Sequence, residues 1–307
     1  MIIANELLER ILLKKNTLDA FRPFPKAALA RLRENFIVDA TYNSNAIEGN
    51  TLNKSETKLV LEEGITIGGK SMREHFEAVN HKEALSFVEN IVTKKQPITK
   101  EILCYLNKII LTNIEDEEKG IYRLRRVHIA GASIIPPMPS LVPSLMEKFL
   151  RWLNYEKESM VDFVALSHEK FLSIHPFIDG NGRVGRLLMS LILMQQGYPP
   201  IVILKTERAK YIKTLDNAHK ENSTPFVNFI GRNIERSLML WIDALQLPGK
   251  DSDKELIPLS EAAKDSPYSQ EYLSLLARKG ILESVKKNRN WLTTKRAVQK
   301  YREEHKQ

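Results

Sequence analysis

The chain lacks most features of disulfide-bonded and membrane-spanning proteins. Cys104 is the only cysteine among 307 residues, which excludes an intrachain disulfide and a metal site built from several cysteines. No apolar run approaches the roughly 18–20 residues of a membrane-spanning helix, and the sequence contains no internal repeat or low-complexity tract. Residues 1–16 include Glu6 and Glu9, so we expect an amphipathic helix there and not a secretory signal. We therefore expect a soluble, cytoplasmic protein without a membrane partner.

Positive charge is in modest excess and unevenly distributed. The net charge is +8, and residues 253–307 contain 12 Lys or Arg against 8 Asp or Glu. Half of the net charge therefore lies in less than a fifth of the chain. This asymmetry marks the C-terminal segment as a candidate for contact with an acidic partner.

Apolar residues recur at helical spacing along most of the first 246 residues, which predicts a mainly α-helical fold. Asn53 followed by Glu56 resembles a capping box, and Gly197 before two prolines predicts a helix end. Residues 187–196, LLMSLILMQQ, are apolar on nearly every face, so we expect a central, buried helix there. The expected helices lie near residues 4–16, 24–48, 53–63, 71–93, 98–112, 139–155, 160–174, 183–196, 206–221 and 225–246.

One stretch departs from helical spacing. Residues 121–137, IYRLRRVHIAGASIIPP, alternate around a turn of Gly131, Ala132 and Ser133. This alternation predicts a short β-hairpin.

The C-terminal segment has a rhythm of its own. Residues 247–258, LPGKDSDKELIP, form a polar linker punctuated by proline and glycine. Short helices are expected at Ser260–Lys264 and Ser269–Lys279, and a β-wing at Ile281–Leu292 around residues 286–289, with a final helix after it. This order resembles the winged helix-turn-helix modules of excisionase-type DNA-binding proteins.

The most informative stretch is residues 175–186, HPFIDGNGRVGR. Its glycines let backbone N–H groups approach phosphate oxygens, and the helix that follows adds positive charge at its N-terminus. Arg183 and Arg186, three residues apart, share one side of the first helical turn. Asp179 beside such a phosphate site suits a ligand of Mg²⁺ bridging phosphates. His175 is then the group that can accept a proton near neutral pH.

These twelve residues resemble the Fic-domain motif, His-Pro-Phe-x-Asp/Glu-Gly-Asn-Gly-Arg-x-x-Arg, at every specified position. The resemblance implies that a Tyr, Ser or Thr hydroxyl of a target protein attacks the α-phosphate of ATP, so that AMP is transferred and pyrophosphate leaves. His175 would be the general base and Asp179 the Mg²⁺ ligand, while Arg186 would hold the γ-phosphate. The kinase-like Doc branch carries lysine at the position of Gly182, so the glycine favours adenylylation over phosphorylation.

A second match lies upstream, in SNAIEG. Ser44, Glu48 and Gly49 fit the inhibitory motif Ser/Thr-x-x-x-Glu-Gly/Asn of self-restrained Fic proteins. Glu48 at a helix end could pair with Arg186 and withhold that arginine from the γ-phosphate. In this class the same glutamate can also support AMP removal, which the sequence leaves open.

The resemblance also indicates where a nucleotide would bind. The hairpin stands where Fic domains carry a flap that holds target segments by strand addition, and the preceding GIYR matches the usual lead-in. Tyr211 and Ile212 stand where the family often has Tyr-Tyr, and His219 where it often has Asn, so the adenine contacts stay uncertain. The full nucleotide-binding set is Glu48, Val127, His128, Ile129, Ala130, Asp179, Gly180, Asn181, Gly182, Arg183, Val184, Gly185, Arg186, Tyr211, Ile212 and His219.

The expected fold is thus a mainly α Fic-type domain with a β-hairpin flap, plus a C-terminal winged helix-turn-helix domain. The domain boundaries are residues 1–100 with the inhibitory helix, 101–246 for the Fic core, 247–258 for the linker and 259–307 for the winged helix.

Two alternatives to adenylylation stay open: a DNA-binding regulator whose Fic core only senses nucleotide, and transfer of UMP or phosphocholine. DNA binding through residues 259–307 and a homodimer also stay open. His75, His81, His128, His168 and His305 have no ligand-like spacing and are expected to be structural or on the surface.

Overall fold

A computed structural model describes residues 2–115, 117–129, 133–154, 159–246, 256–264, 266–287 and 290–304. The chain divides into two compact units, Met1–Ala244 and Leu245–Gln307. Within the described residues, no helix is both long and apolar enough to cross a lipid bilayer.

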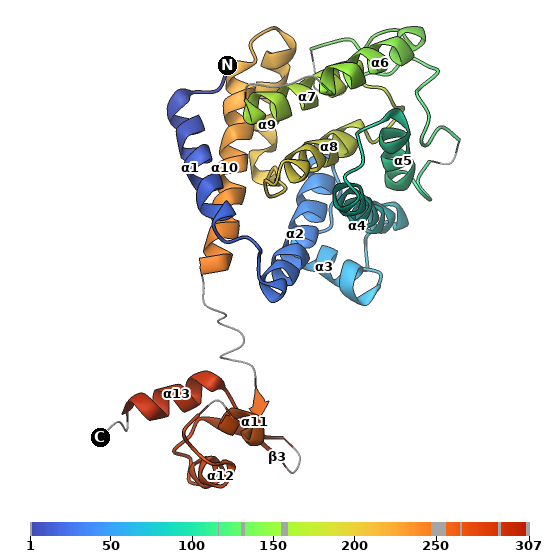
Figure 1. Ribbon diagram of the computed structural model, residues 1–307. Helices are drawn as coiled ribbons and strands as arrows, with labels where there is room; N and C mark the ends of the chain where they lie inside the picture. The colour runs from blue at the N-terminus through green and yellow to red at the C-terminus, as the bar shows by residue number, and fades with distance from the viewer. Residues whose placement is uncertain are drawn as a thin grey trace. The chain divides into compact units, whose positions relative to one another are not determined.

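The first unit is built from α-helices, and each helical range expected from the periodicity holds one (Figure 1). The elements are α1 (Asn5–Asp19), α2 (Lys26–Ile47), α3 (Lys54–Glu63), α4 (Met72–Thr93), α5 (Lys100–Ile110), the 3₁₀ turn η1 (Pro139–Leu141), α6 (Val142–Leu153), α7 (Met160–Ile174), α8 (Asn181–Gln195), the 3₁₀ turn η2 (Lys205–Glu207), α9 (Arg208–His219) and α10 (Thr224–Gln246).

Local sequence signals set several of these helix ends. The Asn53 side chain accepts a hydrogen bond from the Glu56 N–H, and Glu56 bonds back, which confirms the capping box expected before α3. Ser71 and Glu74 make the same pair at the start of α4. After α8, Gly197 adopts a left-handed conformation with φ of 71°, as its place at a helix end requires.

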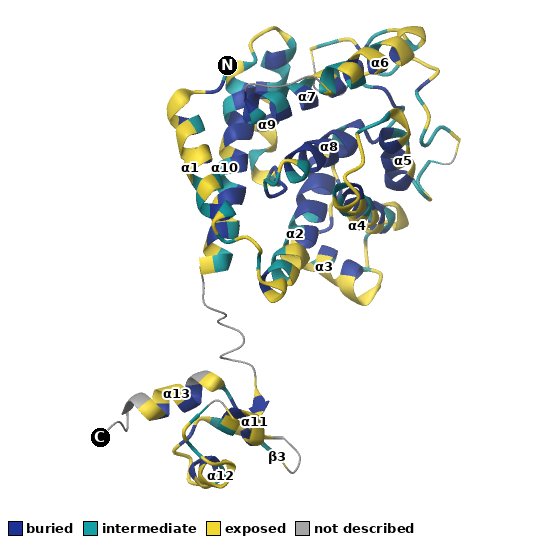
Figure 2. Cartoon of the chain, viewed as in Figure 1, coloured by how far each residue is buried: buried dark blue, intermediate teal, exposed yellow. Residues whose placement is uncertain are grey.

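Helix α8 forms the centre of the first unit. It packs against α2, α4, α5 and α7, and nearly all of its side chains are buried (Figure 2). The expectation of a central, buried helix after the glycine-rich motif is confirmed. The motif therefore leads directly into the helix that most of the core surrounds, which gives the motif residues a rigid base.

The hairpin expected at residues 121–137 is wrong for the described part of that segment, which contains no strand. Its backbone groups bond elsewhere. Arg123 donates to the carbonyls of Arg125 and Pro137, and the Ser133 N–H donates to the Asp216 carboxylate at 2.8 Å. Pro136 and Pro137 also lack the N–H that a strand ladder needs. Residues 130–132, at the expected turn, lie outside the described residues.

The second unit joins short helices to a small sheet. Its elements are β1 (Ile257–Pro258), α11 (Leu259–Lys264), α12 (Gln270–Arg278), β2 (Ser284–Lys287), β3 (Asn290–Thr293) and α13 (Lys295–Glu304). The sheet order is β1-β3-β2 and both pairings are antiparallel. Leu273, Leu276, Leu282 and Tyr301 are buried together in its core.

The sequence assigned Ile257 and Pro258 to the end of the linker, whereas they pair with Thr293 and Leu292 of β3. Ile257 is buried in the core of the second unit, and this burial stabilises the added strand. Residues 247–255 of the expected linker, residues 288–289 of the wing and His305 lie outside the described residues.

Candidate active site

The turn between α7 and α8 carries the motif. His175 follows α7 in a left-handed conformation, with φ of 50°, and its N–H bonds back to the Phe171 carbonyl at 3.0 Å. Gly180 provides a second left-handed residue, with φ of 79°, directly before α8. Phe177 lies between these two residues, and the side-chain amide of Asn181 holds its backbone. The amide accepts a hydrogen bond from the Phe177 N–H at 2.9 Å and donates one to the Phe177 carbonyl at 2.8 Å. The buried Asn181 side chain thus holds the turn, and its place in the nucleotide-binding set stays a prediction.

The N-terminus of α8 presents a ready-made anion site. The first bond within the helix runs from the Val184 N–H to the Gly180 carbonyl at 2.9 Å. The N–H groups of Asn181, Gly182 and Arg183 come before that bond and cannot be satisfied inside the helix. Together with the helix dipole, they favour a phosphate at this end of α8.

His175 is held in a form that can accept a proton. Its Nδ1 lies 3.3 Å from the Leu172 carbonyl oxygen, which can only accept, so Nδ1 donates and Nε2 keeps the lone pair. The pKa of His175 is lowered to about 4, mainly by burial. The positive charge of Arg123 lowers it further, whereas the negative charges of Glu48 and Asp179 act to raise it. The imidazole is therefore neutral at pH 7.

His175 faces a cavity of about 140 Å³. Glu48, Gly182 and Arg186 line the same cavity, so the upstream motif and the glycine-rich motif meet in space. The remaining lining residues are mostly apolar: Ile47, Ile129, Leu172, Arg208, Tyr211, Ile212, Leu215, Asp216 and His219. One end of the cavity thus offers cationic and N–H groups, and the other offers apolar walls of the kind that hold an aromatic base.

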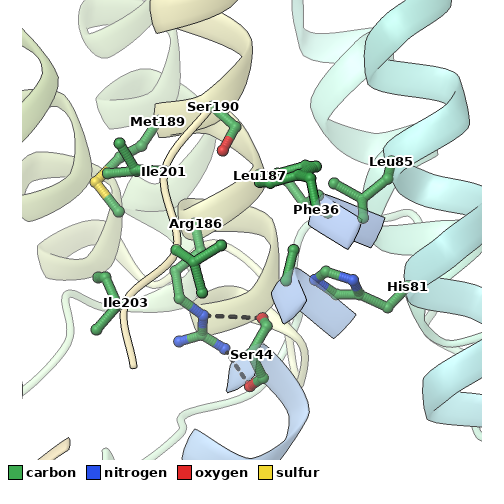
Figure 3. Close-up of a pocket in the computed structure, with 12 residues that line it drawn as sticks. Phe36, Ser44, His81, Leu85, Arg186, Leu187, Met189, Ser190, Ile201 and Ile203 are labelled. Carbon is green, nitrogen blue, oxygen red and sulfur yellow. Dashed lines mark hydrogen bonds between the residues drawn. The ribbon is translucent and has the colours of Figure 1, made fainter. Parts of the chain in front are cut away.

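Arg186 is bound to the end of α2. Its Nη2 donates to Glu48 Oε1 at 2.7 Å and to the Ser44 carbonyl at 2.9 Å, and its Nε donates to Ser44 Oγ at 2.9 Å. Figure 3 shows the bonds to Ser44 beside a small cavity of about 20 Å³. Burial is the largest single influence and lowers the pKa of Arg186, but the charges and hydrogen bonds of Glu48 and Tyr211 together outweigh it, so the pKa is raised. Gly49, with φ of 105°, ends α2 directly after Glu48.

Gly182 makes room for this ion pair. A Cβ on residue 182 would overlap Glu48 Oε1 and would lie 3.2 Å from Arg186 Nη1. Only glycine lets the carboxylate rest against the first turn of α8 while it pairs with Arg186. Gly182 therefore allows the Glu48 side chain to approach the α8 backbone closely, as it would allow a phosphate to do.

Arg183 differs from Arg186 in its bonding. Its side chain is only 3% exposed, and its contacts are long, 3.6 Å to Glu77 Oε1 and 3.4 Å to Asp179 Oδ1. Its Nε and Nη1 have no hydrogen-bond partner within the part of the chain that the structure describes. A buried guanidinium with unused donors is suited to receive an anion.

Asp179 is 45% exposed and lies between two arginines, with Oδ2 3.1 Å from Arg73 Nη2. Its Oδ1 accepts from the Gly180 N–H at 2.6 Å. No group of three or more His, Cys, Asp or Glu side chains suited to a metal occurs among the described residues. Asp179 could therefore contribute one carboxylate to a cation whose other ligands come from phosphates and water.

Two residues that contact His219, but do not line the cavity themselves, were not predicted. Glu169 and Ser173 of α7 hold the His219 ring, with distances from Nδ1 of 3.1 Å to Glu169 Oε1 and 2.8 Å to Ser173 Oγ. Ser173 itself donates to Glu169 Oε1 at 2.7 Å. Their spacing of four places them on one face of α7, but nothing local in the sequence pairs that face with α9.

Tyr211 lines the cavity through its ring, because its hydroxyl bonds to His168 Nε2 at 2.7 Å in the core. Burial raises the pKa of Tyr211 to about 12, so the phenol stays protonated. His168, His75 and His81 are buried, and His128 is exposed.

Other members of the predicted nucleotide set lie away from the cavity walls. Val184 and Gly185 are buried in α8, where Gly185 packs so closely on His168 that a Cβ would lie 2.9 Å from the ring. Of the loop residues, Ile129 lines the cavity whereas Val127 and His128 do not. Ala130 lies outside the described residues.

Residues 97–193 match the model of a protein family described as the Fic/DOC family. The chain is 37% identical over 238 residues to the protein adenylyltransferase Fic of Drosophila ananassae, an alignment that covers 76% of this chain and 47% of the relative. The protein of the same name from Drosophila melanogaster is equally identical, with 48% of its length covered. The chain thus spans about half the length of the curated relatives it matches.

Solved structures give a similar result. A Fic-domain-containing signalling protein from Bacteroides thetaiotaomicron VPI-5482 is 32% identical with a TM-score of 0.71, covering 77% of this chain and 97% of that one. Residues 134–508 of Fic-1 from C. elegans are 31% identical with a TM-score of 0.70, covering 78% and 73%. A Fic family protein from Desulfovibrio desulfuricans G20 is 21% identical with a TM-score of 0.70 over 95% of this chain and 96% of that one, a likeness of fold alone.

Proposed function

The chain belongs to the Fic family, and on that premise we propose that it is a protein adenylyltransferase, which transfers AMP from ATP to a hydroxyl group of a target protein. The observation that carries the proposal is the neutral His175, with Nδ1 bonded to Leu172 and Nε2 left as acceptor beside Gly182 and Arg186. The target hydroxyl gives its proton to Nε2 as its oxygen attacks the α-phosphorus. The bond from the α-phosphorus to the bridging oxygen breaks, and pyrophosphate leaves.

The chain's contribution is positioning and charge. The N–H groups of Gly182 and Arg183 and the unused nitrogens of Arg183 receive phosphate oxygens. The half-exposed carboxylate of Asp179 fits a Mg²⁺ bound through the phosphates, and such an ion would offset their negative charge. Ile129, Tyr211, Ile212 and His219 surround the base.

Self-inhibition belongs to the same proposal. Arg186 is the second arginine of the motif, and Glu48 and Ser44 use its donors. While that ion pair is intact, Arg186 cannot bind a γ-phosphate, and the nucleotide is not held in a productive pose. Release of Glu48 would switch the enzyme on.

One labelling experiment tests the reaction. The protein and a Glu48→Gly variant are incubated with ATP labelled at the α- or the γ-phosphate, with α-labelled UTP as a comparison. We expect protein-bound label from α-labelled ATP only, and more of it on the variant. Label from the γ position would instead mean phosphorylation, and equal label from UTP would mean that the base is not read.

A second candidate function concerns the second unit. The β2–β3 hairpin carries Lys286 over the Trp291 ring at 5.9 Å, beside a two-helix arrangement of the kind that enters a DNA groove. Binding of duplex DNA by the full chain should weaken with salt, and Lys286→Glu should flatten the slope of log K against log salt by about 0.9. If the full chain shifts no duplex at low salt, the unit is assigned to protein contacts.

A further inference from the structure

A buried arginine lies next to His175, and no carboxylate in the described part of the chain pairs with it. Arg123 is 1% exposed, and its guanidinium donates to backbone carbonyls. Nε donates to His175 at 2.8 Å, Nη1 to Arg125 at 3.1 Å, and Nη2 to Pro137 at 2.7 Å and to Ile174 at 3.5 Å. No ion pair to Arg123 occurs among the described residues. Burying a cation is costly unless it is well bonded, so four carbonyls at one guanidinium make a specific structural feature.

The carbonyls come from three places in the chain. Ile174 and His175 are the last residue of α7 and the one after it, while Arg125 and Pro137 lie on the two sides of the loop between α5 and η1. The Arg123 N–H adds a further link, to the Pro176 carbonyl at 2.9 Å. One residue therefore ties both sides of this loop to the peptide that carries the catalytic ring.

The His175 backbone needs such support. A left-handed conformation is costly for a residue other than glycine, and it persists only where the surroundings determine it. Arg123 binds the carbonyl of this very residue. The direction of the His175 side chain follows from its backbone conformation.

We propose that Arg123 is a positioning residue for AMP transfer: it fixes the His175 peptide and the adjoining loop in one arrangement, so that the base meets the target hydroxyl over the α-phosphate. This inference rests on the proposed function of His175. Arg123 lines neither the nucleotide cavity nor the α8 N-terminus, so it acts on the rate of transfer and not on nucleotide binding.

The charge of Arg123 has a second, measurable effect. Burial is the main cause of the low pKa of His175, and Arg123 lowers it further, while the Leu172 carbonyl, Glu48 and Asp179 act to raise it. Replacing Arg123 by a neutral side chain raises the pKa of His175 and moves the acidic limb of the pH–rate profile upward. A purely structural residue would leave that limb unchanged.

The test uses the full chain with Glu48→Gly, to which Arg123→Lys or Arg123→Met is added. Arg126→Lys and Arg126→Met are the matched controls, because Arg126 is an exposed arginine of the same loop. We expect a fall in kcat of about 100-fold for Arg123→Met, with the KM for ATP within threefold and the acidic limb shifted to higher pH. Arg123→Lys keeps the positive charge, so kcat falls less than for Arg123→Met and the acidic limb of the pH–rate profile does not move. The controls should match the parent.

Two results would overturn the inference: kcat of both Arg123 variants within threefold of the parent, or a proportionate loss in kcat and ATP affinity accompanied by a lower unfolding temperature. If Arg123→Met does not fold, Arg123→Lys decides by the same split between kcat and KM. His175→Ala in the same background separates this inference from the proposed function. If the His175→Ala protein is active, the general-base role of His175 is refuted. If it is inactive while the Arg123 variants keep full activity, only the positioning role of Arg123 is refuted.

Discussion

The two ends of the proposed nucleotide cavity are built differently. The cationic end includes His175, Gly182 and Arg186 of one unbroken stretch, residues 175–186, with Glu48 added from the end of α2; Arg208 and Asp216 of α9 also line the cavity. The apolar end gathers single residues from α7, α9 and the loop before η1, among them Leu172, Ile129 and His219. A phosphate is recognised by a local backbone arrangement and can be encoded in a few neighbouring residues. A base is recognised by surfaces that only packing brings together.

The two ends also differ in how far their polar groups are satisfied. At the cationic end, Arg183 has N–H groups without a hydrogen-bond partner in the described part of the chain, while Arg186 donates hydrogen bonds to Glu48 and Ser44. At the apolar end the Tyr211 hydroxyl and His219 Nδ1 already have partners in the core. Substitutions at the cationic end should therefore change the reaction strongly, and those at the apolar end should change mainly nucleotide affinity.

The largest effect is expected for His175→Ala. Loss of general-base catalysis costs roughly 10²–10⁴-fold in rate, and the nucleotide should still bind because the α8 N-terminus is untouched. The rate of α-labelled AMP transfer in the Glu48→Gly background measures it. Transfer by His175→Ala at close to the parent rate would show that the cationic end works without this base.

Glu48→Gly should raise self-modification about 10- to 100-fold, because hydrogen bonds to a charged group contribute roughly 1.5–3 kcal/mol and each 1.4 kcal/mol is a factor of ten. Adding Arg186→Ala should abolish this increase in self-modification, because the released Arg186 side chain is the group that binds the γ-phosphate. The control is Glu62→Gly on α3, an exposed glutamate outside the site. A Glu48→Gly protein no more active than the unchanged chain would reduce the Glu48–Arg186 pair to a structural contact.

At the apolar end, His219→Ala should raise the KM for ATP about 2- to 10-fold, the worth of one hydrogen bond, and should leave kcat nearly unchanged. Glu169 and Ser173 hold Nδ1, so Nε2 is the nitrogen left for the base. His219→Asn, which restores a polar group, should recover part of the affinity. Steady-state kinetics with ATP and UTP measures the change, and a loss confined to kcat would contradict the contrast between the two ends.

The pH dependence sharpens the contrast further. The pKa of His175 is depressed from its usual 6.5 to about 4, so the neutral base is present above pH 5 and is lost only as the pH falls through 4. With ATP well below its KM, where the rate reports the free enzyme, the transfer rate in the Glu48→Gly background should therefore change less than twofold between pH 8 and pH 6. A base with a pKa of 6.5 would instead lose about fourfold over this range.

The smallest effect is expected for Tyr211→Phe. The ring that lines the cavity is kept, so the KM for ATP should stay within twofold. The lost bond to His168 should lower the free energy of unfolding by about 1 kcal/mol, measured by urea unfolding at pH 7.5. A large rise in KM with unchanged stability would mean that the hydroxyl contacts the nucleotide and not the core.

Local patterns predicted the helices well. Their apolar spacing is repeated over many turns, and capping residues such as Asn53 mark their ends. The same kind of reasoning failed at residues 121–137, where alternation favoured a hairpin. Arg123 is buried, and its side chain bonds to carbonyls that a strand ladder would otherwise use. A pattern of side-chain types does not show which backbone groups a buried arginine will bind.

The sequence by itself determined the helical fold, the glycine-rich turn with its histidine, and the candidate glutamate, because each depends on neighbours within about a dozen residues. The resemblance to Fic proteins also predicted that Glu48 pairs with Arg186, and tertiary packing brings these two residues together across 138 positions. Tertiary structure alone decided that Asn181 clamps the turn, that Tyr211 turns its hydroxyl to His168, and that Arg123 joins the loop to His175. The physical reason is that a buried polar group must find a partner, and which partner is within reach depends on how distant segments pack.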